Sequence, residues 1–110
     1  MSNDVTEEQG ALVVHLEGDV DLDHAPSIRT LLLNCVARGR NLFVDLSDVN
    51  YIDSSGIASL IEALQGCTNA GTTFGLVAVS NQAMRVIELA RLDKVFAIHA
   101  NKDEALSASA

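Results

Sequence analysis

The chain has 110 residues, of which 48% are hydrophobic, and it carries a formal net charge of −8 at pH 7. This apolar fraction argues against intrinsic disorder, and the length predicts one domain spanning residues 1–110. The acidic balance disfavours nucleic acid and anionic membranes as partners, so we expect a protein partner with a basic face.

The beginning of the chain predicts a cytosolic protein. The first ten residues, MSNDVTEEQG, are polar and acidic, whereas a secretory signal is basic and then apolar. No apolar run approaches the roughly 20 residues that a membrane span needs, so no membrane insertion is expected.

The cysteines and histidines predict neither a metal site nor a cofactor site. Cys35 and Cys67 are isolated and lie in helix patterns, so we expect two buried free thiols. His15, His24 and His99 show no metal-ligand spacing with each other or with the cysteines.

Two strands are expected first. The segment 11–21, ALVVHLEGDVD, opens with apolar and β-branched residues and then alternates, as a strand does. A weaker strand at 3–8 would pair with it as a hairpin through Gln9-Gly10.

The segment 23–39 is predicted to be a helix. Pro26 fits a first turn, where the missing N–H group costs nothing, Asp23 is the candidate N-cap, and Gly39 fits the position after the last turn. An apolar stripe at 3.6-residue spacing consists of Ile28, Leu31, Leu32, Cys35 and Val36.

The rest of the chain alternates strands with helices. In chain order we expect a short strand at 41–47, a helix at 54–67, a strand at 72–80, a helix at 81–92, a strand at 95–99 and a helix at 101–108. Such alternation favours parallel strands joined by right-handed crossovers. The prediction is an α/β fold with one mixed, mainly parallel sheet of about four or five strands and about four helices, in the order β-β-α-β-α-β-α-β-α.

The helix at 54–67 is expected to have a core face and an exposed face. The predicted core stripe consists of Ile57, Leu60, Ile61 and Leu64. The opposite side carries Ser55, Ser59, Glu62 and Gly66.

The start of this helix, Asp53-Ser54-Ser55-Gly56, suggests two kinds of chemistry. A helix start exposes unpaired N–H groups and the positive end of the helix dipole, so a serine there normally caps the helix. The same groups would hold a phosphate, and Gly56 would let another molecule approach the backbone closely. From these four residues alone, capping is the commoner role and modification is the alternative.

A second acidic group, GDVDLD at 18–23, is accompanied by Asp45 at the end of the next expected strand. Carboxylates at strand ends can bind Mg²⁺, as in receiver domains, but the order of elements does not match that plan. A solvated acidic turn is the simpler interpretation. The chain also lacks a GxSxG elbow and a glycine-rich phosphate loop, so we predict no enzymatic activity.

Residues 43–64, FVDLSDVNYIDSSGIASLIEAL, resemble the central motif of the STAS domain family, in particular of bacterial anti-sigma factor antagonists. That motif is approximately D-L-S-x-V-x-x-I-D-S-[ST]-G-x-x-x-L. The matching residues are Asp45, Leu46, Ser47, Val49, Ile52, Asp53, Ser54, Ser55, Gly56 and Leu60. The segment 16–26, LEGDVDLDHAP, is similar to the family's G-x-[LI]-D segment, although His24 stands where many relatives have Thr or Ser. The resemblance implies the STAS fold over nearly the whole chain.

The resemblance also implies a phosphorylation-gated binding module. In the family, the first serine of the motif, here Ser54, is phosphorylated by an anti-sigma factor serine kinase that binds ATP and has a histidine-kinase-like fold. The unphosphorylated antagonist sequesters this kinase and frees the sigma factor, the phosphorylated antagonist releases the kinase, and a PP2C-type serine phosphatase resets the switch. The partner-binding residues that it implies are Asp21, Asp23, Asp53, Ser55, Gly56, Ser59 and Glu62, with Ser55 expected to cap the helix.

Two alternatives remain open on the sequence. Some STAS domains are subunits of ABC-type lipid transport complexes, where they bind the ATPase without a phosphate switch. A receiver-like, Mg²⁺-dependent phospho-acceptor is the other.

Overall fold

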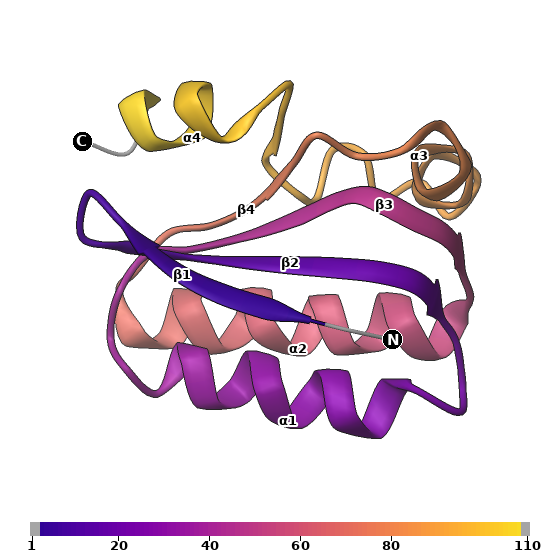
Figure 1. Cartoon of the computed structure of the whole chain (residues 1–110), viewed down its shortest axis with the longest axis horizontal. Helices are drawn as coiled ribbons and strands as arrows, with labels where there is room; N and C mark the ends of the chain where they lie inside the picture. Colours follow the sequence, from indigo (N-terminus) through magenta and orange to yellow (C-terminus); the bar gives the residue numbers. More distant parts are fainter. Residues whose placement is uncertain (1–2, 109–110) are drawn as a thin grey trace.

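The computed structural model describes residues 3–108, in which a five-stranded sheet lies between two layers of helices (Figure 1). The elements are β1 (Asp4–Glu8), β2 (Ala11–Val20), α1 (Ala25–Val36), β3 (Leu42–Ile52), α2 (Ser54–Ala70), β4 (Phe74–Val77), α3 (Asn81–Leu89), β5 (Ile98–His99) and α4 (Lys102–Ala108). The strands lie side by side in chain order, β1 antiparallel to β2 and the others parallel. The predicted α/β class and order of elements are confirmed.

The hairpin between β1 and β2 turns at the residues predicted from the sequence. Gln9 and Gly10 both have positive φ angles, 53° and 82°, which is the backbone of the two-residue turn that matches strand twist. The turn places Glu8 opposite Ala11 and Asp4 opposite His15.

The two faces of the sheet are covered differently. Helices α1 and α2 lie together against one face, and α3 and α4 lie on the other (Figure 1). The main core includes alternate residues of β2, namely Leu12, Val14 and Leu16, and contains both cysteines, which are buried free thiols as predicted. A smaller cluster, Ala11, Phe43, Val77, Ala105 and Leu106, lies where α4 covers the sheet.

Several boundaries differ from the prediction. Strand β3 continues to Ile52 instead of ending at residue 47, because it stays paired with β2 up to the pair Val20 and Ile52 although its later residues are largely polar. Strand β4 ends at Val77, just before Ala78 adopts a positive φ of 51°. Strand β5 is only two residues long.

The helices are also bounded differently. Helix α1 occupies Ala25–Val36 rather than 23–39, α2 continues to Ala70, and α3 ends at Leu89. Within residues 3–108, no helix is both long and apolar enough to cross a bilayer.

Candidate functional site

The candidate site lies where β2 and β3 end side by side. These strands are parallel, and the last residues that they pair are Val20 and Ile52. The chain then turns into α1 through Asp21 and into α2 through Asp53, so both acidic residues stand at one edge of the sheet. This edge is where open α/β sheets usually bind their ligands.

Asp53 connects the two turns through its carboxylate. One oxygen, Oδ1, accepts hydrogen bonds from the backbone N–H groups of Ser55 at 2.9 Å and Gly56 at 3.2 Å. The other, Oδ2, accepts from the N–H of Leu22 at 3.1 Å, in the turn that leads to α1. Asp53 is therefore the N-cap of α2.

The expectation that Ser55 caps α2 is wrong. A carboxylate has two acceptor oxygens, so Asp53 can cap α2 and at the same time hold the turn that follows β2. The half-buried Ser55 instead offers its backbone carbonyl to the hydroxyl of Ser59, which donates a hydrogen bond at 3.2 Å.

Ser54 is exposed and is the first residue of α2. Among the hydrogen bonds of residues 3–108, none involves its hydroxyl group. Because Asp53 already satisfies the N–H groups at the helix start, Ser54 has no capping role and its hydroxyl faces solvent.

Gly56 fixes the position of α2 against the end of β2. A Cβ atom at this residue would lie 2.4 Å from the backbone oxygen of Val20 and 2.8 Å from Cγ1 of Ile52. Gly56 is buried, so the backbone that approaches it closely belongs to this chain and not, as the sequence suggested, to another molecule.

Asp21 is held by His24. Its Oδ1 accepts from the His24 backbone N–H at 3.2 Å and lies 2.7 Å from His24 Nδ1. Desolvation raises the pKa of Asp21, but the hydrogen bonds and charge of His24 outweigh it, so this pKa lies below its ordinary value of 3.8. The Asp21–His24 pair therefore stabilises the fold at pH values above the ordinary pKa of aspartate. This contribution is lost as the pH falls through the lowered pKa of Asp21.

The predicted cap of α1 at Asp23 is wrong. The N-cap position is His24, whose side chain makes no capping hydrogen bond, and Asp21 supplies the acceptor for the first turn. Asp23 is exposed to solvent beside this turn.

The exposed face expected for α2 is partly covered, because α1 packs beside α2 as well as against the sheet. Ser59 is only 4% exposed, and Gly66 faces the side chain of Val36. Glu62 remains half exposed and forms an ion pair with Arg29 of α1.

A groove of about 440 Å³ runs between α1 and α2 and begins beside Ser55. Its lining includes Leu22, Pro26, Arg29, Ala58 and Glu62. Leu22 is 70% exposed, and Tyr51, two residues before Asp53, is 52% exposed. Neither residue was predicted from the sequence. The available signals were an apolar residue between two acidic residues, for Leu22, and the only tyrosine of the chain, for Tyr51.

The acidic residues that the sequence suggested as Mg²⁺ ligands do not lie close to one another. Asp21 is paired with His24 at the strand ends, whereas Asp45 lies beside His15 in the middle of the sheet. Within the described part of the chain, these residues form no group with the spacing of metal ligands.

The profile of the STAS domain family matches residues 2–105. The anti-sigma-B factor antagonist of Bacillus subtilis is 25% identical over 100 residues, which cover 91% of this chain and 92% of that protein. The anti-sigma-F factor antagonist RsfB of Mycobacterium tuberculosis is 29% identical, over 94% of this chain and 84% of the relative. A crystal structure of an anti-sigma factor antagonist from Mycobacterium paratuberculosis superimposes with a TM-score of 0.88 at 31% identity, over 98% of this chain and 92% of the other.

The close approach at Gly56 predicts that Gly56→Ala destabilises the protein. The added methyl group meets a backbone oxygen that cannot move away without shifting β2, so we expect a loss of about 2 kcal/mol or more in the free energy of unfolding. Urea denaturation measures this loss.

Gly66→Ala is the matched control in the same helix. Its Cβ would meet Cγ1 of Val36 at 2.8 Å but, unlike that of Gly56, no backbone atom, and alanine favours a helix by about 1 kcal/mol relative to glycine. Equal destabilisation by the two substitutions would contradict the packing described for Gly56.

Proposed function

This chain belongs to the STAS domain family, and on that premise we propose that it is an anti-sigma factor antagonist whose binding is gated by phosphorylation of Ser54. Unphosphorylated, it sequesters an anti-sigma factor serine kinase with a histidine-kinase-like, ATP-binding fold. Phosphorylated, it releases the kinase, and a PP2C-type serine phosphatase restores the binding form.

The accessibility of Ser54 is the observation that supports this proposal. A kinase must bring ATP to the hydroxyl oxygen, and this hydroxyl is exposed and makes no hydrogen bond with the described residues. Asp53 carries out the capping that would otherwise occupy a serine at this position. Phosphorylation therefore removes no hydrogen bond that holds α2 in place.

The effect of a phosphate on binding follows from charge. A phosphoserine adds about −1.5 to −2 charges at neutral pH, here next to Asp53 on a chain that already carries −8. In the free protein, the N-terminal end of α2 favours this added negative charge. In a docked complex the phosphate would lose its water while it lies beside the Asp53 carboxylate, with no solvent to screen their repulsion, and a cost of about 3 kcal/mol would weaken binding by roughly 100-fold.

The surface around Ser54 has the features of a protein-binding site. We define the docking face as Leu22, Asp23, Ser54, Ser55, Ala58 and Glu62, which lie around the start of the groove between α1 and α2. It combines an exposed apolar side chain, Leu22, with acidic residues around it, as interfaces commonly do. The negative charge suits a basic partner surface.

The other residues that the family resemblance implies for partner binding lie beneath the docking face and support it. Asp21, Asp53 and Gly56 set the backbone of the two turns, and Ser59 lies beneath Ser55. We therefore assign them to positioning and not to direct contact with the partner.

We expect the kinase to phosphorylate Ser54 and no other residue. After incubation with ATP and an anti-sigma factor serine kinase from the same organism, peptide mass spectrometry should place one acid-stable phosphate on Ser54. Ser54→Asp should bind the kinase about 100-fold more weakly than Ser54→Ala, as measured by isothermal titration calorimetry.

Ser107→Asp is the matched charge control, because Ser107 is exposed on α4, on the opposite side of the sheet. It should bind the kinase as the wild type does. A phosphate on another residue, or equal affinities of Ser54→Ala and Ser54→Asp, would refute the proposal. Binding to an ABC-type ATPase without any phosphate dependence would favour the transport subunit instead.

Leu22 is expected to contribute directly to docking. Leu22→Ser removes the exposed apolar side chain beside Ser54. As an apolar anchor of the docking face, Leu22 should contribute about 1.4 kcal/mol to binding, so affinity should fall by about tenfold. Leu89→Ser is the control, since Leu89 is 79% exposed at the end of α3. Both variants should unfold within about 0.5 kcal/mol of the wild type, and equal loss of binding in both would exclude Leu22 from the interface.

A further inference from the structure

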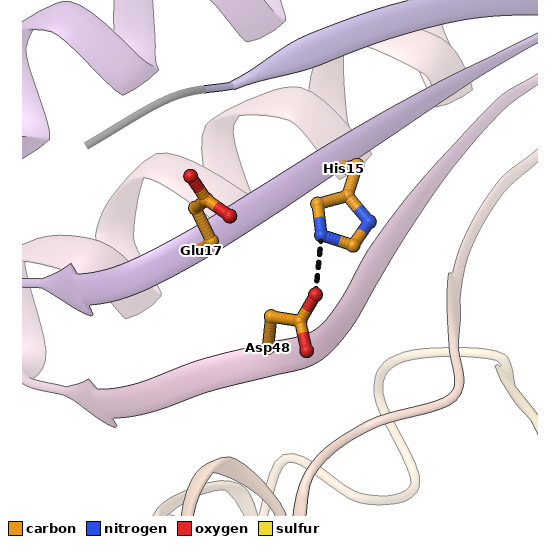
Figure 2. A group of neighbouring side chains, drawn as sticks. All are labelled: His15, Glu17 and Asp48. Atoms are coloured by element: carbon orange, nitrogen blue, oxygen red, sulfur yellow. Dashed lines mark hydrogen bonds and ion pairs between the residues drawn. The ribbon is translucent and has the colours of Figure 1, made fainter.

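A histidine and two carboxylates converge on the sheet at a place that the proposed function does not use. His15 and Glu17 extend from β2 and Asp48 from the neighbouring strand β3 (Figure 2). One nitrogen or oxygen atom from each of the three lies within 4.8 Å of the others. Within residues 3–108, this is the one group of histidine, cysteine and acidic side chains with such spacing.

The register of β2 and β3 creates this group. His15 is paired with Asp45 and Glu17 with Asp48, so two steps along β2 correspond to three steps along β3. The extra residue is a bulge, and it returns Asp48 to the face that carries Asp45. Without it, strict alternation would direct Asp48 toward the opposite face, where α1 and α2 pack.

His15 is oriented by carboxylates at both ring nitrogens. Its Nε2 lies 2.9 Å from Oδ2 of Asp48, and its Nδ1 lies 3.7 Å from Oδ2 of Asp45. Asp45 is itself fixed, because its Oδ1 accepts the backbone N–H of Ser47 at 2.8 Å. The Asp45 contact is too long for a hydrogen bond, but it places a carboxylate on the side of the second ring nitrogen, where such a bond orients histidine ligands in metal sites.

The surroundings favour a cation. A cavity of about 270 Å³ adjoins the group, and His15, Glu17 and Asp45 contribute to its lining. The other ionisable residues of this lining are Asp4, Glu8 and Lys102, and the Lys102 ammonium group is paired with Glu8. The lining therefore holds four carboxylates and one lysine.

We propose that His15, Glu17 and Asp48 form a binding site for a divalent transition metal ion, with Zn²⁺ as the best match. Zinc accepts imidazole nitrogen and carboxylate oxygen together, and three protein ligands leave one tetrahedral position for water. Nε2 of His15 faces the metal position, and Asp45 orients the ring from behind. A bound ion would bridge β2 and β3 and offset part of the negative charge of the chain.

Zinc titration of the full chain tests the site. We expect ZnCl₂ alone to bind with a stoichiometry of one per chain in isothermal titration calorimetry, and to raise the melting temperature in proportion to the logarithm of its concentration. His15→Gln and Asp48→Asn should each weaken binding by more than tenfold. Asp45→Asn should weaken it by about 10- to 100-fold while the stoichiometry stays at one.

His24→Gln is the matched control, because His24 also contacts an aspartate, Asp21, but belongs to no group of three candidate ligands among residues 3–108. It should bind zinc as the wild type does. The imidazole NMR signals of the wild type give a readout that needs no variant: zinc should shift those of His15 and leave those of His99 in place. Absence of saturable binding, unchanged binding in His15→Gln, or loss of binding in His24→Gln would overturn the proposal.

Discussion

The organisation of the functional end of this molecule depends on the carboxylate of Asp53. One of its oxygens caps α2 and the other holds the turn after β2 through the backbone of Leu22. The hydrogen bonds connect segments that are 31 residues apart in the chain. Because a charged acceptor makes stronger hydrogen bonds than a neutral one, this residue can fix both turns and leave the adjacent Ser54 hydroxyl unused. Asp53 therefore supports the structure, and the next residue, Ser54, is available for the proposed phosphorylation.

The pairing of β2 with β3 determines the positions of both the docking face and the proposed zinc site. Its parallel direction brings Asp21 and Asp53 to one edge, and its bulge brings Asp48 to the face that carries His15 and Asp45. The docking face and the proposed zinc site therefore depend on the same pair of strands. The docking face lies at the strand ends, and the zinc site lies on the sheet face opposite α1 and α2. Both regions reach solvent, because Ser54 and Asp48 are exposed and His15 and Glu17 are half-buried.

Local patterns predicted much of this fold. Periodicity, Pro26 and the Gln9-Gly10 turn predicted the class, the order of elements and the hairpin, because these features are encoded within a few residues. The errors concern contacts between distant segments. Residue spacing predicts an exposed Ser59 because it does not show that α1 packs beside α2. Aspartate and serine are about equally good N-caps, so the local sequence does not show that Asp53, and not Ser55, caps α2.

The proposed zinc site also depends on contacts between distant segments, which the sequence does not reveal. His15 and Asp48 are 33 residues apart, and their contact depends on a one-residue bulge that leaves no clear mark in the sequence. The family motif, in contrast, is a contiguous stretch, so the resemblance identified residues 43–64 correctly as part of a STAS domain. The role of Ser54 stays a prediction.

Negative charge added at Ser54 should weaken docking without rearranging the fold. Amide NMR spectra of the chain before and after phosphorylation at Ser54 test it most directly. We predict chemical-shift changes confined to residues 20–26 and 51–59, with the amides of β1, β4 and α4 unchanged. Shift changes spread across the whole sheet, or loss of the dispersed spectrum, would mean that the phosphate acts by rearranging the fold.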